Sequence, residues 1–217
     1  MIKVVIFDFD DTICLTEEAC FILENRVAES MNFPPMTRKT HQKNWGLPLK
    51  TAIVERLPGI NVDEFIKRQI KFMAETIEKG LLDKIPQENL DVLESIKKGG
   101  KKLAILTSRD TNEVKHLLHE SHPFNGLIEA FYHRDNSKYH KPDPRVFDEI
   151  LDKLESRPEE SVYVGDAISD AAAAKGAGMH FIAVLESGLR DRKYFAEQEV
   201  DFFAPKFVDI IDYLLRH

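Results

Sequence analysis

Residues 4–12 read Val-Val-Ile-Phe-Asp-Phe-Asp-Asp-Thr, an apolar run that ends in closely spaced carboxylates. The run at 4–9 predicts a strand that is buried on both faces, as in a parallel sheet covered by helices. Similar runs predict further strands at residues 103–106, 127–131, 162–164 and 181–184. Helical patterns separate or follow these runs at residues 87–98, 111–122, 144–154, 168–176 and 206–216. This alternation predicts an α/β fold with a doubly wound, Rossmann-like parallel sheet.

The carboxylates that follow the first strand are the first candidates for chemistry. Ligands of open parallel sheets bind beyond the carboxyl ends of the strands, which is where Asp8, Asp10 and Asp11 would lie. Crowded carboxylates repel one another, and a divalent cation such as magnesium relieves that repulsion. An aspartate in such a site can also attack phosphorus. An acidic turn that caps the next helix would give the same pattern, so these residues alone do not decide the function.

Residues 15–82 interrupt the alternation with helical patterns only, at 16–31, 49–57 and 62–79. We therefore expect a small all-helical domain at 15–82, inserted into an α/β domain formed by residues 1–14 and 83–217.

The bulk composition argues against several classes of protein. The 217 residues carry a formal net charge of −7, so the basic excess typical of nucleic-acid binders is missing. No apolar run reaches the roughly 20 residues that span a bilayer, and the start lacks the pattern of a signal peptide. Cys14 and Cys20 have no metal-type pairing, and we expect buried, reduced thiols. These features predict a cytoplasmic protein, either a monomer or a homodimer, with no membrane or nucleic-acid partner.

A second motif, Thr107-Ser108-Arg109, follows the strand expected at 103–106. A hydroxyl followed by backbone N–H groups at the start of a helix can hold a phosphate group. Arg109 adjoins this cradle and is therefore a candidate for substrate contact. Simple capping of the next helix by Thr107, Ser108 or Asp110 would explain the same residues.

Two further motifs add a cation and more carboxylates. Lys141 lies between His140 and Pro142 in a loop that proline restricts, where its charge could stabilise a phosphoryl group. Asp166 follows the strand expected at 162–164, and Asp170 lies one helical turn later on the same face. All four motifs lie at the ends of separate predicted strands, and their chemistries fit one reaction on a phosphorylated substrate.

At these residues the sequence resembles the haloacid dehalogenase-like hydrolase superfamily, most closely its phosphoglycolate-phosphatase-like branch. The motifs appear in order as DFDDT (8–12), LAILTS (103–108), HKPDP (140–144) and VGDAISD (164–170). The resemblance covers nearly the whole chain. It implies that the helical block is a mobile cap, which closes over the site and excludes water.

The resemblance also implies roles for individual residues. Asp8 would be the nucleophile, and Asp10 would protonate the leaving oxygen and then activate water. Thr107 and Lys141 would hold the phosphate, with Ser108 and Arg109 beside them. Magnesium would be bound by Asp8, the Asp10 carbonyl and Asp166, with Asp170 supporting the metal or the lysine. The implied activity is hydrolysis of a small phosphorylated metabolite through an aspartyl-phosphate.

Several alternatives remain open from the sequence. A β-phosphoglucomutase-like phosphomutase uses the same core residues and differs in the cap, where Lys43, Trp45 and Lys50 are the candidates. A 2-haloacid dehalogenase needs no metal and usually lacks the second aspartate, and a non-catalytic binding protein would not need these acidic pairs. The substrate is left undecided among phosphoglycolate, a sugar phosphate, a nucleotide and pyrophosphate.

Asp11 and three histidines are the remaining residues of interest in the sequence. Many relatives have glycine at the position of Asp11 in this chain. The Asp11 carboxylate could add negative charge near the cation or contact the cap. The histidines His41, His116 and His119 show no metal-type spacing, and we expect all of them at the surface.

Overall fold

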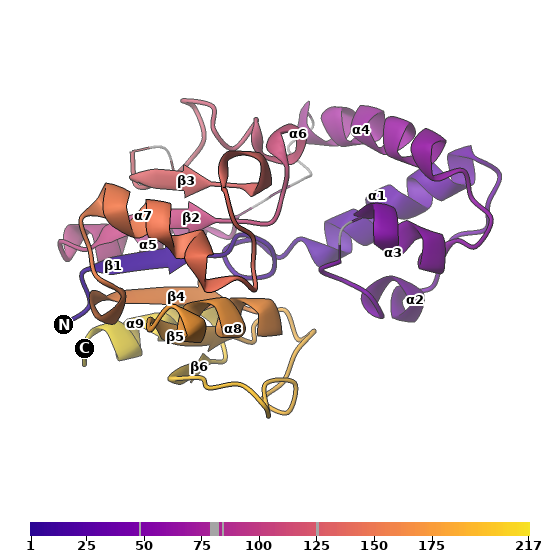
Figure 1. The fold of residues 1–217 in the computed structure, drawn as a ribbon. Coiled ribbons are helices and arrows are strands. Elements are labelled where there is room, and N and C mark those ends of the chain that lie inside the picture. The colour runs from indigo at the N-terminus through magenta and orange to yellow at the C-terminus, as the bar shows by residue number, and fades with distance from the viewer. Residues whose placement is uncertain (48, 79–82, 84, 125) are drawn as a thin grey trace. The chain divides into compact units, whose positions relative to one another are not determined.

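The computed structural model describes residues 1–47, 49–78, 83, 85–124 and 126–217, and the chain forms two compact units (Figure 1). One unit consists of Met1–Cys14 and Ile85–His217, and the other of Leu15–Lys84. No helix among the described residues is both long enough and apolar enough to cross a membrane.

The described part of the first unit contains a six-stranded sheet in the order β3-β2-β1-β4-β5-β6, in which all neighbouring strands are parallel. The strands are β1 (Val4–Phe7), β2 (Lys102–Leu106), β3 (Ala130–Tyr132), β4 (Ser161–Gly165), β5 (His180–Val184) and β6 (Phe202–Ala204). The sheet order reverses direction at β1, which pairs with β2 on one side and with β4 on the other. The predicted doubly wound α/β fold is confirmed. Strand β3 begins later than the strand expected at 127–131, and β6 was not predicted.

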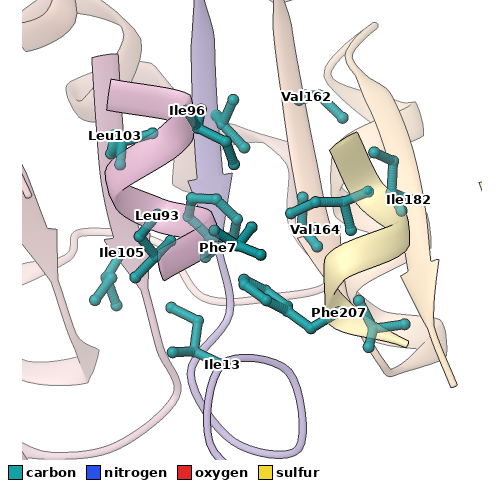
Figure 2. Packing of buried hydrophobic residues seen from close by; sticks show 14 of the residues in the cluster. Phe7, Ile13, Leu93, Ile96, Leu103, Ile105, Val162, Val164, Ile182 and Phe207 are labelled. Carbon is teal, nitrogen blue, oxygen red and sulfur yellow. The ribbon is translucent and has the colours of Figure 1, made fainter. Parts of the chain in front are cut away.

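Side chains alternate between the two faces of the sheet, and each face carries its own core. Phe7 and Val164 belong to the core that α5 (Gln87–Lys98), the 3-10 turn η4 (Phe207–Asp209) and α9 (Ile210–Leu214) cover, as Figure 2 shows. Ile6 and Tyr163 belong to the core on the opposite face, beneath η2 (Pro144–Phe147), α7 (Asp148–Leu154) and α8 (Ile168–Gly176). Apolar burial on both faces explains why the strand sequences are continuously hydrophobic.

Helices α5 and α8 have the bounds that the sequence predicts, but α6 does not. It covers only Thr111–Val114, whereas a helix was expected at 111–122. Beyond Val114 the chain forms successive tight turns, with Leu117 N–H bonded to the Val114 carbonyl at 2.8 Å and His122 N–H to the His119 carbonyl at 2.9 Å. The proline that follows His122 disfavours helical geometry there. The remaining short 3-10 turns are η1 (Arg134–Asn136) and η3 (Pro158–Glu160).

The second unit contains α1 (Glu17–Ser30), α2 (Arg38–Gln42), α3 (Leu49–Arg56) and α4 (Val62–Glu78). Its apolar core gathers side chains from these helices and their connections, including Val27, Ile53 and Phe65. The expected end of the last helix at residue 79 and the expected domain boundary at 82 lie outside the described residues. Helix α2 was not predicted, because five residues show too little periodicity.

The expected surface position of His41 is wrong. Its side chain is fully buried in the second unit, where Nδ1 lies 2.8 Å from Glu17 Oε1 and Nε2 lies 3.5 Å from Glu24 Oε1. Glu24 is in turn paired with the buried Arg56 at 2.7 Å. Polar partners of this kind satisfy groups that would be costly to bury alone, so the histidine can lie inside the unit.

Candidate active site

The candidate site lies where neighbouring strands of the first unit end. Asp8, Thr107 and Asp166 directly follow β1, β2 and β4, which are adjacent in the sheet. The Asp8 N–H donates to the Val164 carbonyl at 2.8 Å, and the Thr107 N–H donates to the Tyr132 carbonyl at 3.0 Å. The ladder therefore fixes these backbones at the crevice beside β1, the place where open α/β sheets bind ligands.

Three buried carboxylates lie together, two at the ends of β1 and β4 and one in α8. One oxygen each from Asp8, Asp166 and Asp170 lies within 4.8 Å of the others. Burial raises the pKa of the Asp8 carboxyl from 3.8 to about 7, against the attraction of the Lys141 ammonium. Burial, followed by the charges of Asp170 and Asp8, also raises the pKa of Asp166 well above its ordinary value. Oxygen donors held in this way suit a hard divalent cation, because such an ion would offset their repulsion.

Asp170 shapes the turn that presents Asp166. Its Oδ2 accepts hydrogen bonds from the N–H groups of Asp166 at 3.1 Å and Ala167 at 3.0 Å. A Cβ at Gly165 would come within 2.4 Å of that same oxygen. Glycine is thus required at 165 because the aspartate approaches closely, rather than because the turn needs a left-handed backbone.

Lys141 contacts two of the clustered carboxylates and a tyrosine of strand β4. Its Nζ lies 3.1 Å from Asp8 Oδ1 and 2.7 Å from Asp170 Oδ1, and its side chain is only 5% exposed. Burial alone would lower the pKa of the Lys141 ammonium. The Asp170 and Asp8 carboxylates nevertheless hold this pKa well above its ordinary value. The ammonium also donates to the Tyr163 hydroxyl at 2.9 Å, and that hydroxyl donates to the Leu106 carbonyl at 3.0 Å.

Tyr163 was not singled out from the sequence. Its ring packs edge-on against Phe147, with centroids 5.0 Å apart, and so belongs to the core beneath α7 and α8. A tyrosine within an otherwise aliphatic buried strand is the signal that could have found it, because a buried hydroxyl needs a polar partner.

The Asp10 carboxylate points to Arg109 and is not among the clustered carboxylates of Asp8, Asp166 and Asp170. Arg109 Nη2 lies 2.7 Å from Asp10 Oδ1, and Arg109 Nε lies 3.0 Å from Asp10 Oδ2. The guanidinium also lies over the Phe9 ring, 4.8 Å from its centroid. The two residues are far apart in the sequence, and nothing in the motifs predicted this ion pair.

The turn after β2 places the remaining candidates of the second motif. Thr107 is buried, and its Oγ1 accepts the Arg109 N–H at 3.3 Å, while Ser108 is exposed. Asp110 caps α6, with its side chain accepting from Asn112 N–H and Glu113 N–H. Because Asp110 performs the capping, neither Thr107 nor Ser108 is needed for it.

Asp11 and the candidate residues of the helical unit lie in different surroundings. Asp11 is buried, with a backbone φ of 52°. In the second unit Lys43 is exposed, and Lys50 is exposed with its Nζ 3.3 Å from Asp63 Oδ1. The half-buried Trp45 ring lies 5.1 Å from the His41 ring, so it forms part of the packing inside that unit.

Comparison with known proteins connects this arrangement to a family. The model of the haloacid dehalogenase-like hydrolases matches residues 5–184. A phosphorylated carbohydrates phosphatase of Thermotoga maritima is 29% identical over 198 residues, which are 90% of each chain. Pyrophosphatase PpaX of Anoxybacillus flavithermus is 26% identical over 98% of this chain and 97% of its own. A solved structure from Thermotoga maritima, provisionally identified as a beta-phosphoglucomutase, is 29% identical with a TM-score of 0.82 and 99% of both chains covered.

Proposed function

Because the chain belongs to the haloacid dehalogenase-like hydrolase family, we propose that it is a magnesium-dependent phosphatase that acts on a small phosphate monoester. The observation that carries this proposal is the cluster of Asp8, Asp166 and Asp170, in which Lys141 is paired with Asp8 and Asp170. The names of the relatives, which include a phosphorylated carbohydrates phosphatase and a pyrophosphatase, agree with phosphorylated substrates.

In this proposal Asp8 attacks the phosphorus atom, and the bond from phosphorus to the leaving oxygen breaks as the aspartyl-phosphate forms. Asp10 gives its proton to that oxygen, and then takes a proton from the water that attacks the aspartyl-phosphate. Lys141, Thr107 and Ser108 hold the phosphate oxygens, and Arg109 contacts the substrate beside them. Lys141 is suited to this role because its ammonium is already fixed by buried partners.

Asp8, Asp166, Asp170 and the Asp10 carbonyl are the groups that would hold magnesium. A bound magnesium ion would neutralise carboxylate and phosphate charge in this site. The raised pKa values of Asp8 and Asp166 support this assignment, because they reflect anionic groups that are buried without enough compensating charge.

The helical unit is proposed to act as a cap that selects the substrate, with the domain boundaries expected from the sequence at 1–14, 15–82 and 83–217. The α/β unit holds every residue to which the proposal gives a chemical step, so the helical unit is available for selection. Phosphoglycolate, sugar phosphates and pyrophosphate are the substrates that we would test first. We further propose that the protein works in the cytoplasm as a monomer or homodimer.

A phosphomutase is the second candidate, favoured by the similarity to the structure provisionally identified as a beta-phosphoglucomutase. Such an enzyme would return the phosphoryl group from Asp8 to a sugar rather than to water. The two candidates therefore differ only in what accepts the phosphoryl group.

The deciding experiment measures phosphate release from a panel of phosphorylated metabolites, with β-glucose 1-phosphate isomerisation assayed in parallel. We expect magnesium-dependent phosphate release that EDTA abolishes and that Asp8→Asn lacks. Isomerisation without phosphate release would identify a phosphomutase. Turnover that survives EDTA, or that survives in the purified Asp8→Asn protein, would contradict the proposed mechanism.

A further inference from the structure

In the described part of the chain, three side-chain oxygens lie close to the Lys141 ammonium, as many as it has N–H bonds to donate. Asp170 Oδ1 lies 2.7 Å from Lys141 Nζ, the Tyr163 hydroxyl 2.9 Å and Asp8 Oδ1 3.1 Å. The Lys141 side chain is buried at this position. A phosphate oxygen that binds Lys141 would therefore replace one of these three oxygens.

Asp8 is the neighbour that can be replaced. Its oxygen is the farthest of the three from the Lys141 Nζ, and its carboxylate is proposed to form the bond to phosphorus. Once that bond forms, the Asp8 side chain carries less negative charge, and the charge that Lys141 balances lies on the phosphoryl oxygens instead. Asp170 is less easily replaced, because its other oxygen accepts hydrogen bonds from the N–H groups of Asp166 and Ala167.

The Tyr163 hydroxyl is held in a fixed place by the fold. It donates to the Leu106 carbonyl at 3.0 Å while it accepts from the Lys141 ammonium. The Tyr163 side chain is fully buried, and its ring lies edge-on to Phe147 with centroids 5.0 Å apart. Leu106 is the last residue of β2 and directly precedes Thr107, so the hydroxyl also fixes Lys141 relative to the turn proposed to hold phosphate.

A hydroxyl is suited to this position because it can hold an ammonium without adding charge. A third carboxylate beside Lys141 would repel the phosphate group, whereas a tyrosine hydroxyl does not. We propose that Tyr163 is a positioning residue that keeps the Lys141 ammonium in place while Lys141 exchanges Asp8 for a phosphate oxygen. This inference rests on the proposed function and adds a residue of β4 to the groups on which the reaction depends.

The first test compares the hydrolysis of p-nitrophenyl phosphate by Tyr163→Phe and Phe147→Leu. Tyr163→Phe removes the hydroxyl and keeps the ring, so kcat should fall ~5–10-fold while KM changes by less than about 2-fold. Phe147→Leu is the matched control, because it loosens the same ring contact and keeps the hydroxyl. It should lower the free energy of unfolding without lowering kcat. Equal losses of kcat in the two variants, or an unchanged kcat in Tyr163→Phe, would overturn the positioning role.

A double-mutant cycle with Lys141→Arg tests whether Tyr163 acts through Lys141. Arginine keeps the positive charge, but its planar guanidinium directs its N–H groups differently from an ammonium. Tyr163→Phe should therefore change kcat by less than about 2-fold in the Lys141→Arg background. A further loss of ~5–10-fold in that background would show that the hydroxyl acts independently of the ammonium, and would contradict positioning.

Nitrogen–proton correlation NMR of the lysine side chains needs no turnover, and therefore separates the positioning role from the proposed function. A buried ammonium that three oxygens hold should exchange its protons slowly and give a resolved signal, which Lys141→Arg would identify by its loss. The signal should disappear in Tyr163→Phe and persist in Phe147→Leu. If the native protein hydrolyses no phosphate ester, the phosphatase proposal fails while this signal still decides whether Tyr163 holds Lys141. A native protein without the signal, or a signal that is unchanged in Tyr163→Phe, would contradict the positioning role.

Discussion

Replacing the proposed nucleophile by asparagine should make the metal-free protein more stable. Burial raises the pKa of Asp8 from 3.8 to about 7, so the folded protein holds a proton there that the unfolded chain has already lost. Stability contributed by this group is therefore lost as the pH rises from about 4 to about 7, and it stays low above that range. The rise corresponds to about 4 kcal/mol in the free energy of unfolding.

Asparagine matches the protonated aspartate in size and carries no charge. The Asp8→Asn and native proteins should consequently have similar free energies of unfolding near pH 4. The variant should then gain stability over the native protein with rising pH, up to about 4 kcal/mol at pH 8 in EDTA. Lys141 keeps Asp170 at 2.7 Å in the variant, so the substitution does not leave the ammonium unpaired. Magnesium at pH 8 should narrow the difference, since a bound cation stabilises the native site more.

The assay is urea unfolding between pH 4 and pH 8, followed by far-UV circular dichroism. Hydrogen exchange of the β1 and β4 amides reports on the stability of the unit that contains Asp8. Fluorescence of the single tryptophan reports on the other unit, Leu15–Lys84. Asp212→Asn, an exposed position in α9, is the control and should show no comparable gain. An Asp8→Asn protein that is no more stable than the native protein at pH 8 in EDTA would refute the reasoning.

Two further substitutions test the geometry around Lys141 and Asp170. Tyr163→Phe removes the hydroxyl that anchors Lys141 and should lower kcat by ~5–10-fold with little change in KM. Tyr213→Phe loses a partly buried contact to His180 and should leave kcat unchanged. Equal kcat values in the two variants would rule out an anchoring role for Tyr163. Gly165→Ala places a Cβ 2.4 Å from Asp170 Oδ2 and should cost on the order of 1–3 kcal/mol in thermal or urea unfolding. Gly176→Ala, whose Cβ would meet Pro144 at 3.1 Å, should cost less, and the reverse order would contradict the close-approach explanation.

The fold was predictable from the sequence wherever hydrophobic patterns were long. Helices α5 and α8 have the expected bounds, and β1, β2, β4 and β5 lie within about two residues of theirs. Those elements are buried by a two-sided sheet, so their sequences carry a strong apolar signal. Failures occurred where local turns replace a helical pattern, as after α6, and where tertiary contacts decide burial. His41 is the clearest case, because its burial depends on Glu17 and Glu24 from another helix.

The meeting of Asp8, Thr107 and Asp166 was predictable for a different reason. Parallel strands end at the same edge of a sheet, so residues that follow neighbouring strands must lie close together. The partners of those residues were not predictable in the same way. The contact of Arg109 with Asp10 joins residues 99 apart in sequence, and depends on side-chain directions that no spacing encodes.

The backbone conformation of Asp11 shows how an aspartate fits the turn after β1. Its φ of 52° lies in the left-handed region, which favours glycine over most other residues. Aspartate tolerates that region better than most residues, so the turn between Asp10 and Thr12 is compatible with the substitution. What the substitution adds is a buried carboxylate, whose charge contributes, after burial and the charges of Asp170 and Asp8, to the raised pKa of Asp166. The Asp11 carboxylate therefore adds negative charge beside the carboxylate cluster, and such charge would attract a divalent cation more strongly.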